Sequence, residues 1–456
     1  MEFYKPPTVS PPGKVLGVLG SVREVRRNVL SIIPSIAFQQ PIVTGTTGPA
    51  RWHMVQGPEG MRHVFLDNVD NYPKSEVMIR MLRSAVGASL FTSEGADWRW
   101  QRRAIAPVFA ARNVDTLAPM MTATAERACA RLEKAGGSAE LVTEMLSATF
   151  DVICDVALSG REHFDADVYG AAITKYFLTV GRASLLDFLE LPPWVPRPGE
   201  ILGRGAVRTM HRMVANAIED RRKQEGGQGR GEDLLDYMLA AQDPKTKRKM
   251  DRQDLLHNMQ FFIVAGHETT ALALSWALLM LAHSPELQRR ASAEAQAALG
   301  HRPAEAHDLA RMPMVEPILN ESMRLYPPVG MLARNVHQFD RIYDRDINPK
   351  ETVFLNIYSL HRHELYWDNP DAFDPTRFLS EQNVNQKKYL HLPFGAGPRV
   401  CVGANFAMIQ AQIILATLLA RFEFLPDGPE PEPVMLMTIR PEPGVQLRIR
   451  QLNSPA

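Results

Sequence analysis

Residues 394–403 read FGAGPRVCVG, and this stretch, here called the cysteine loop, decides how the rest of the chain is interpreted. It holds Cys401, one of only three cysteines, among three glycines and with Arg399 two residues before it. An apolar segment with helical periodicity follows. A cysteine at a helix start meets free N–H groups and the positive end of the helix dipole, which favour a thiolate. The loop therefore predicts a thiolate with a chemical role.

Thiolates bind soft metals and haem iron, so a metal or cofactor ligand is one interpretation of Cys401. The glycines Gly395 and Gly397 permit tight turns, Gly403 leaves room for a flat group beside the helix, and Arg399 offers a charge to an anion. The alternative is a buried structural cysteine in a glycine-rich turn. A zinc site is disfavoured, because no second Cys or His stands nearby at zinc-ligand spacing.

A second conspicuous segment, residues 261–282, reads FFIVAGHETTALALSWALLMLA. Its length suits a membrane span, but His267, Glu268 and two threonines inside it would be costly in hydrocarbon. The mean hydropathy of the chain is −0.18. We therefore expect a long helix through the centre of a soluble protein, with no transmembrane anchor.

The polar cluster in this segment, AGHETT, suggests two kinds of site. A zincin helix would need a second histidine at position 271, which is Ala271, so that interpretation fails. The hydroxyl of Thr269 can instead bond back to the carbonyl of Ala265, four residues earlier, and open the helix locally. A cluster that merely packs against other helices is the alternative.

Composition narrows the functional classes. The chain has 456 residues, with 51 basic and 51 acidic side chains, so no global field attracts nucleic acid or a membrane surface. Three widely spaced cysteines fit a reducing compartment, and the polar, Pro-rich start has no signal-peptide pattern. We expect a cytoplasmic protein.

Periodicity along the chain is mostly helical, and three pieces resemble strands: ARWHMVQG, TVFLNIYSL and VQLRIR. The Gly-rich stretch 225–233 and the Pro-rich stretch 189–200 are expected to be connections rather than domain linkers. The sequence therefore predicts a single domain over residues 1–456, mainly α with a minor β part.

Four ordered motifs together resemble the cytochrome P-450 family of haem-thiolate monooxygenases, over nearly the whole chain. The resemblance implies haem b (iron protoporphyrin IX) buried between the distal helix and the cysteine loop. It makes Cys401 the axial iron ligand, puts Phe394 and Gly395 beside the sulfur, and pairs Arg399 with a haem propionate. A donating thiolate helps to cleave the O–O bond of bound oxygen.

The resemblance gives further residues roles. On the distal helix, Ala265 and Gly266 would leave space for dioxygen, while Glu268 and Thr269 would deliver protons. Residues Trp98, Arg102 and Arg334 would contact the propionates. The sequence NESMRLYPP supplies Glu321 and Arg324, which with Arg377 of DAFDPTRF would form a structural trio under the haem.

One departure from the soluble bacterial pattern is visible, since many such relatives carry His where this chain has Trp98, and Trp is commoner in other branches. The resemblance still favours a soluble bacterial monooxygenase. Electrons would come from NAD(P)H through a separate ferredoxin and its reductase, without a fused reductase domain. A peroxide-driven haem-thiolate enzyme and a non-catalytic sensor or carrier are the rivals, and the Glu268–Thr269 pair argues against both.

Two further predictions concern the substrate and the electron-donor protein. By family position the substrate pocket draws on the apolar, Met-rich segments 77–90, 261–265, 329–332 and 435–438, which favours a small lipophilic substrate. Within the first segment, side chains Arg80 and Arg83 are either solvated or able to hold a substrate carboxylate. A basic patch on the proximal side would steer an acidic ferredoxin. We expect it to consist of Arg99, Arg103, Lys387 and Lys388.

Overall fold

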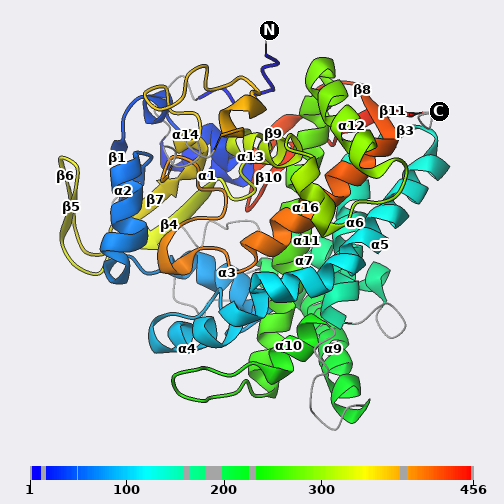
Figure 1. Cartoon of the computed structure of the whole chain (residues 1–456). Coiled ribbons are helices and arrows are strands. Elements are labelled where there is room, and N and C mark those ends of the chain that lie inside the picture. Colours follow the sequence, from blue (N-terminus) through cyan, green and yellow to red (C-terminus); the bar gives the residue numbers. More distant parts are fainter. Residues whose placement is uncertain are drawn as a thin grey trace.

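The computed structural model describes residues 3–11, 17–48, 50–158, 165–179, 198–224, 233–380 and 388–452. Helices form most of it, and the largest sheet lies in the left half of the view in Figure 1, inward of the β5–β6 hairpin. The α-helices are α1 (Val18–Arg27), α2 (Pro58–Arg62), α3 (Glu76–Val86), α4 (Gly95–Ile105), α5 (Ala111–Ala135), α6 (Leu141–Leu158), α7 (Ala166–Thr179), α9 (Pro198–Gln224), α10 (Leu234–Ala240), α11 (Arg252–Ala282), α12 (Pro285–Leu299), α13 (Val315–Leu325), α14 (Ile357–Leu360) and α16 (Ala404–Arg421). The predicted class, mainly α with a minor β part, is confirmed.

Small sheets accompany these helices. The largest has the strand order β1-β2-β7-β4, in which β2 and β7 run parallel with Trp52 opposite Thr352, and β4 is antiparallel to β7. The strands are β1 (Ile42–Thr47), β2 (Ala50–Val55), β3 (Gly137–Glu140), β4 (Met331–Asn335), β5 (Asp340–Ile342), β6 (Arg345–Ile347), β7 (Thr352–Asn356), β8 (Phe422–Pro426), β9 (Glu432–Met435), β10 (Ile439–Glu442) and β11 (Gln446–Gln451).

The long central helix is α11, as the apolar segment predicted. Asp251 caps its start in a reciprocal capping box with Asp254, and Pro285 opens the next helix soon after its end. Two helices of the described chain, α11 and α16, are long and apolar enough to cross a membrane. Their apolar windows are 83% and 61% buried within the protein, so core packing accounts for both.

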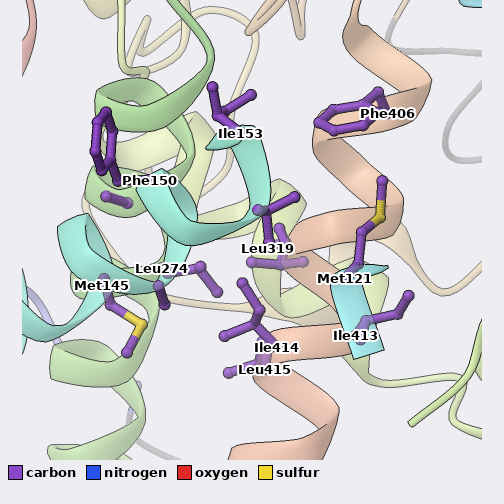
Figure 2. Packing of buried hydrophobic residues seen from close by; sticks show 14 of the residues in the cluster. Met121, Met145, Phe150, Ile153, Leu274, Leu319, Phe406, Ile413, Ile414 and Leu415 are labelled. Carbon is purple, nitrogen blue, oxygen red and sulfur yellow. The ribbon is translucent and has the colours of Figure 1, made fainter. Parts of the chain in front are cut away.

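The core forms where α5, α6, α11, α13 and α16 meet. Figure 2 shows side chains from all five helices turned toward one another. Those labelled are Met121 of α5, Met145, Phe150 and Ile153 of α6, Leu274 of α11, Leu319 of α13, and Phe406, Ile413, Ile414 and Leu415 of α16. This packing fixes α16, which begins just after the cysteine loop, against the central helix α11.

The strand predictions were right but incomplete. The three predicted strand segments contain β2, β7 and β11, although the second continues as helix α14 after Asn356. The remaining strands are three to six residues long and take their conformation from pairing, so their sequences carry weak periodicity. The predicted connection 225–233 lies outside the described residues except for Asp233, and so does 189–200 except for its last three residues.

Candidate active site

The cysteine loop is a tightly turned segment that leads into α16. Its glycines Gly395 and Gly397 have φ angles of +72° and +68°. A Cβ atom on Gly397 would lie 2.0 Å from the carbonyl oxygen of Phe65, so only glycine fits there. The N–H of Cys401 donates to the carbonyl of Phe394 at 3.0 Å and closes the loop. The backbone therefore fixes the position of the sulfur.

The surroundings of Cys401 act on its thiol pKa in both directions, and the net shift is upward, against the expectation for a helix start. Its side chain is exposed, yet protein surrounds it closely enough that desolvation raises the pKa of the thiol. The N–H of Gly403 and the guanidinium of Arg102 act in the opposite direction and lower that pKa. A Cβ atom on Gly403 would touch only Phe109, at 3.8 Å, so this side of the N-terminus of α16 stays accessible.

A group of buried cations lies beside the loop. Arg399 donates to the carbonyl of Tyr72 at 2.8 Å and to the carboxylate of Glu94 at 2.6 Å, and its Nε is buried without a partner among the described residues. Arg334 is 6% exposed and donates to the carbonyl of Ala333. Burial, together with the charge of Arg399, lowers the pKa of Arg334 to about 10.

Lys74 completes this group. Its ammonium donates to the carbonyls of Leu90, Phe91 and Ser93 and lies 3.9 Å from the carboxylate of Glu94. Burial lowers the pKa of Lys74 to about 7. The group contains one carboxylate, that of Glu94, and three basic side chains, those of Lys74, Arg334 and Arg399. Arg334 and Arg399 alone exceed that carboxylate by one positive charge, and Lys74 adds to the excess only in its protonated form, so the group can accept further carboxylates.

One face of α11 is less buried than the rest of the helix. Between residues 258 and 282, the side chains that are not fully buried are those of Phe261, Ala265, Gly266 and Thr269. Three of them stand four residues apart and share a helix face. The hydroxyl of Thr269 donates to the carbonyl of Ala265 at 3.0 Å, as predicted. Small side chains therefore leave an accessible stripe on an otherwise buried helix.

Two neighbours in the AGHETT cluster face elsewhere. A Cβ atom on Gly266 would come within 2.8 Å of Ile153, so this glycine also lets α6 approach α11 closely. His267 is buried and stacks edge-on against Phe150, with ring centroids 5.6 Å apart. These contacts give both residues a packing role, and space for dioxygen beside Gly266 stays a prediction.

The carboxylate of Glu268 points toward β10 and not along the accessible stripe. Its Oε1 accepts hydrogen bonds from the hydroxyl of Thr438 at 2.5 Å and from Nε of Arg440 at 2.8 Å. The residue is only 4% exposed. An ionised carboxylate at this depth needs such a partner, and Arg440 supplies it.

The predicted trio Glu321, Arg324 and Arg377 is present. Arg324 binds the Glu321 carboxylate through two nitrogens, at 2.7 and 2.8 Å, and Arg377 approaches it at 3.3 Å. The side chains of Glu321 and Arg324 are 0% exposed. The trio ties α13 to the segment 370–377, and that arrangement suits a structural role.

Comparison with known proteins identifies the family to which the chain belongs. The sequence model of the family described as Cytochrome P450 matches residues 7–449. The chain belongs to the cytochrome P450 family. It is 30% identical to human Cytochrome P450 4F12 over 87% of this chain and 80% of that protein. It is 27% identical to Protein LUTEIN DEFICIENT 5, chloroplastic, of Arabidopsis thaliana, over 97% of this chain and 78% of that protein.

Two solved structures share the fold. A structure titled "Crystal structure of cytochrome P450DA heme domain" aligns with a TM-score of 0.84 and 23% identity, covering 99% of both chains. A cyanobacterial P450 with bound retinoic acid aligns with a TM-score of 0.78 and 23% identity, covering 90% of this chain and 92% of that one. The two sequence relatives named above are human and plant proteins, so the bacterial origin stays a prediction.

As a P450, the protein is a haem-dependent monooxygenase whose cofactor is iron protoporphyrin IX. The residues present fit this group on three observations. The thiol of Cys401 is accessible beside the N-terminus of α16, the cation group has more positive charges than carboxylates, as suits propionates, and Ala265 and Thr269 leave part of α11 accessible. Arg102 lies near enough to Cys401 to affect its pKa, and the guanidinium of Arg399 lies 5.6 Å from the ring centre of Trp98.

The predicted ferredoxin patch needs a correction. Nε and Nη2 of Arg103 donate to the two oxygens of Asp243, at 2.8 and 2.7 Å, so this charge is neutralised within the protein. The exposed side chain of Arg99 lies 3.7 Å from Asp70, Lys388 is exposed, and Lys387 lies outside the described residues. Helical spacing placed Arg103 correctly on α4, but it could not reveal a carboxylate 140 residues later.

Sequence reasoning missed Lys74, Glu94, Asp243 and Arg440. Lys74 stands in YPKS and Glu94 in TSEG, and neither string carries a motif. Lys74 reaches the site because its segment forms a bridge with Arg334 of β4. The one usable signal was a charged side chain beside apolar residues, as with Arg440 after MLMTI, and that signal is weak in a single sequence.

Contacts link some of the predicted pocket segments. The N–H of Leu90, at the end of the first segment, donates to Asn258 of α11 at 2.8 Å, and the next residue, Phe91, packs against Phe261 with ring centroids 5.7 Å apart. A Cβ atom on Gly330 would meet Ile439 at 2.8 Å and the sulfur of Met435 at 2.9 Å. The first segment therefore contacts α11, and the segments around Gly330 and Met435 contact each other. Arg80 is half-buried and Arg83 is exposed.

Proposed function

We propose that this P450 inserts one atom of dioxygen into a lipophilic organic substrate and reduces the other atom to water. For a hydroxylation the balance is one substrate C–H bond, O2, NAD(P)H and one proton, giving an alcohol, water and NAD(P)+. The observation that carries the proposal is the accessible Cys401 thiol at the start of α16, next to the guanidiniums of Arg399 and Arg102.

We propose that Cys401 is the axial iron ligand. The haem, when bound, supplies the oxygen chemistry, and thiolate ligation favours cleavage of the O–O bond. The cysteine loop holds the sulfur through its backbone, and Phe394 contributes the carbonyl that fixes Cys401. The N–H of Gly403 and the charge of Arg102 support the thiolate form.

Arg399, Arg334, Trp98 and Arg102 are proposed to hold the propionates. Burial of Arg334 and the unpartnered Nε of Arg399 support this role, because buried donors without acceptors are costly. On the other side, Ala265 provides room above the haem. The Thr269 hydroxyl is placed to hold a proton and pass it on, with Glu268 as the acid behind it.

The test of the ligand is Cys401→His. The variant should bind haem weakly or not at all, and its reduced carbon monoxide complex should lose the long-wavelength band of thiolate-ligated haem. Cys129→Ala is the control, since Cys129 is a buried cysteine of α5. A band that survives in Cys401→His would show that another residue ligates the iron.

We propose electron delivery by a separate ferredoxin with its reductase, and a cytoplasmic location. Burial of α11 and α16 in the core supports the location, and the exposed side chains of Arg99 and Lys388 offer docking charges. Product formation that requires NAD(P)H, ferredoxin and reductase would separate this function from a peroxide-driven enzyme and from a carrier. As one domain over residues 1–456, the chain would contribute the haem part of that system.

The substrate class is proposed from the pocket, whose predicted segments are apolar and contain methionine. A panel of dodecanoate, retinoic acid and a neutral alkane, scored by the low- to high-spin shift of the haem, tests it. Retinoic acid is included because a solved neighbour binds it. If a carboxylate is recognised by Arg80, Arg80→Ala should weaken dodecanoate at least tenfold more than the alkane.

A further inference from the structure

Arg440 contacts the proton-delivery acid from outside the distal helix. Both hydrogen bonds that Glu268 accepts, from Thr438 and from Arg440, end on Oε1, and Nη2 of Arg440 lies 2.7 Å from the same atom. The second oxygen, Oε2, receives no hydrogen bond from the described residues. One oxygen of the acid is therefore held in place while the other is free to exchange a proton.

The pair spans the boundary between core and solvent. The side chain of Glu268 is 5% exposed and that of Arg440 is 36% exposed. The guanidinium thus joins a buried carboxylate to a region that is open to water. This differs from a wholly buried ion pair, which would seal the carboxylate from solvent.

Arg440 also belongs to the hairpin that carries the substrate turn. Strand β10 pairs with β9, with Arg440 opposite Val434, and residues 436–438 form the turn between them. The hairpin has other anchors, because Trp276 donates to the carbonyl of Ile439 at 3.1 Å and Ile439 donates to the carbonyl of Pro328 at 3.1 Å. Its position therefore does not depend on Arg440 alone.

We propose that Arg440 is a positioning residue for Glu268 that connects the substrate turn to proton delivery. It holds Oε1 in the ionised acid and leaves Oε2 to take a proton from solvent. The acid then releases that proton inward toward Thr269, so the carboxyl gains one proton and loses one in each cycle. The proposal rests on the proposed function of Glu268, and Arg440 itself acts only through that carboxylate.

The first experiment compares Arg440→Gln, Arg440→Lys and Arg131→Gln. Arg131 is the matched control: its side chain is 32% exposed and lies 3.0 Å from Asp151, whose side chain is 3% exposed, between α5 and α6. The rate of NAD(P)H oxidation with ferredoxin and reductase is measured in H2O and in D2O, without added substrate. The same preparations are checked for the carbon monoxide band of thiolate-ligated haem.

We expect Arg440→Gln to oxidise NAD(P)H about threefold to tenfold more slowly and to show a larger solvent isotope effect, because the acid is no longer held. Arg440→Lys should recover much of both, and Arg131→Gln should match the wild type. Wild-type values in Arg440→Gln would overturn the proposal. So would a Lys variant as poor as the Gln variant, or an equal loss in Arg131→Gln.

The second experiment separates positioning from structural support without using activity. Backbone hydrogen exchange over residues 433–442 is measured in the wild type, Arg440→Gln and Thr438→Val. Rates within about twofold of the wild type are expected, because strand pairing and Trp276 still hold the hairpin. A hairpin that opens about tenfold more often in Arg440→Gln would make Arg440 a structural tie and overturn the positioning role.

Thr438→Val keeps the test decisive if Arg440→Gln folds poorly. It removes the other donor to Oε1 without removing a charge, and a smaller change in the same direction is expected in the isotope effect. No change in Thr438→Val would then count against the proposal. Failure of the proposed function looks different, since the wild type itself would lack the carbon monoxide band or NAD(P)H oxidation.

Discussion

Two carboxylates of this P450 meet arginines inside the protein, and their surroundings differ. Glu321 binds Arg324 through both oxygens, and the five N–H donors of Arg324 all have acceptors. The remaining donors reach the carbonyls of His361, Pro370 and Ala372. At this site every polar atom is engaged, and nothing is left to react.

Glu268 is the opposite case. Its Oε1 carries all the hydrogen bonds that the described residues make to it, and its arginine partner is 36% exposed. The same pair of residue types therefore serves two purposes. A closed network holds segments of the chain together, whereas a network with one free oxygen and an exposed partner can exchange protons with solvent.

The largest effect is expected where the network is closed. Glu321→Ala leaves Arg324 buried and without its counter-charge, and breaking such a pair destabilises a protein by about 3–5 kcal/mol. We expect little soluble protein and no stable haem incorporation. Soluble yield and the haem-to-protein ratio measure this. A variant that folds and holds haem normally would remove the distinction between the two carboxylates.

Glu268→Gln should leave folding nearly intact and reduce activity, in contrast to Glu321→Ala. The amide still accepts a hydrogen bond from Thr438 or Arg440, so the thermal midpoint should fall only by a few degrees. Proton delivery needs the carboxyl, so NAD(P)H oxidation should slow by about tenfold or more. Unfolding followed by circular dichroism and the rate of NAD(P)H oxidation are measured on the same preparation. A normal rate would reassign Glu268 to structure.

The contrast also shows what the sequence could predict. Residues close in sequence were placed correctly: Thr269 bonds to Ala265, Arg324 pairs with Glu321, and two glycines of the cysteine loop, Gly395 and Gly397, adopt positive φ. These features follow from helix geometry and from backbone sterics, which act over a few residues. The fold class followed from periodicity for the same reason.

Partners that are distant in sequence were not predictable from the pattern. Glu268 and Arg440 are 172 positions apart, and Arg103 and Asp243 are 140 apart. Whether a charged side chain is solvated or paired depends on which elements the fold brings together. The resemblance to a family supplied the Arg377 contact, because its motif already encodes a distant pairing, but it supplied nothing for Lys74 or Glu94.

Thr269→Ala tests the inner end of the proton route and should have a smaller effect than Glu268→Gln on folding. The variant loses one hydrogen bond within α11 and should keep haem and ligand binding. Electrons should be diverted to hydrogen peroxide, because the proton is no longer placed. Peroxide formed per NAD(P)H consumed measures this, and an unchanged ratio of product to NAD(P)H would exclude Thr269 from proton delivery.

The smallest effect is expected at a third ion pair, between Arg103 and Asp243. In this pair the arginine is partly exposed and the carboxylate is buried. The carboxylate of Asp243 is close to the surface but has no exposed area, and its arginine holds the pKa of Asp243 well below the usual range. A lowered carboxyl pKa stabilises the fold above about pH 4 and ceases to do so as the pH falls through the lowered value. The stabilising contribution of Arg103 should therefore decline in acid.

Arg103→Gln should consequently lower the thermal midpoint by a few degrees at pH 7, and the gap to the wild type should narrow below about pH 4. Arg99→Gln on the same helix is the control, since the exposed Arg99 lies 3.7 Å from an exposed Asp70 and its loss should leave the midpoint unchanged.

The rate of reduction by ferredoxin should rank the same two variants in the opposite order. This rate should fall with rising salt and with Arg99→Gln, while Arg103→Gln leaves it unchanged, because the charge of Arg103 is already neutralised. A ferredoxin rate that depends on Arg103 and not on Arg99 would restore Arg103 to the docking surface.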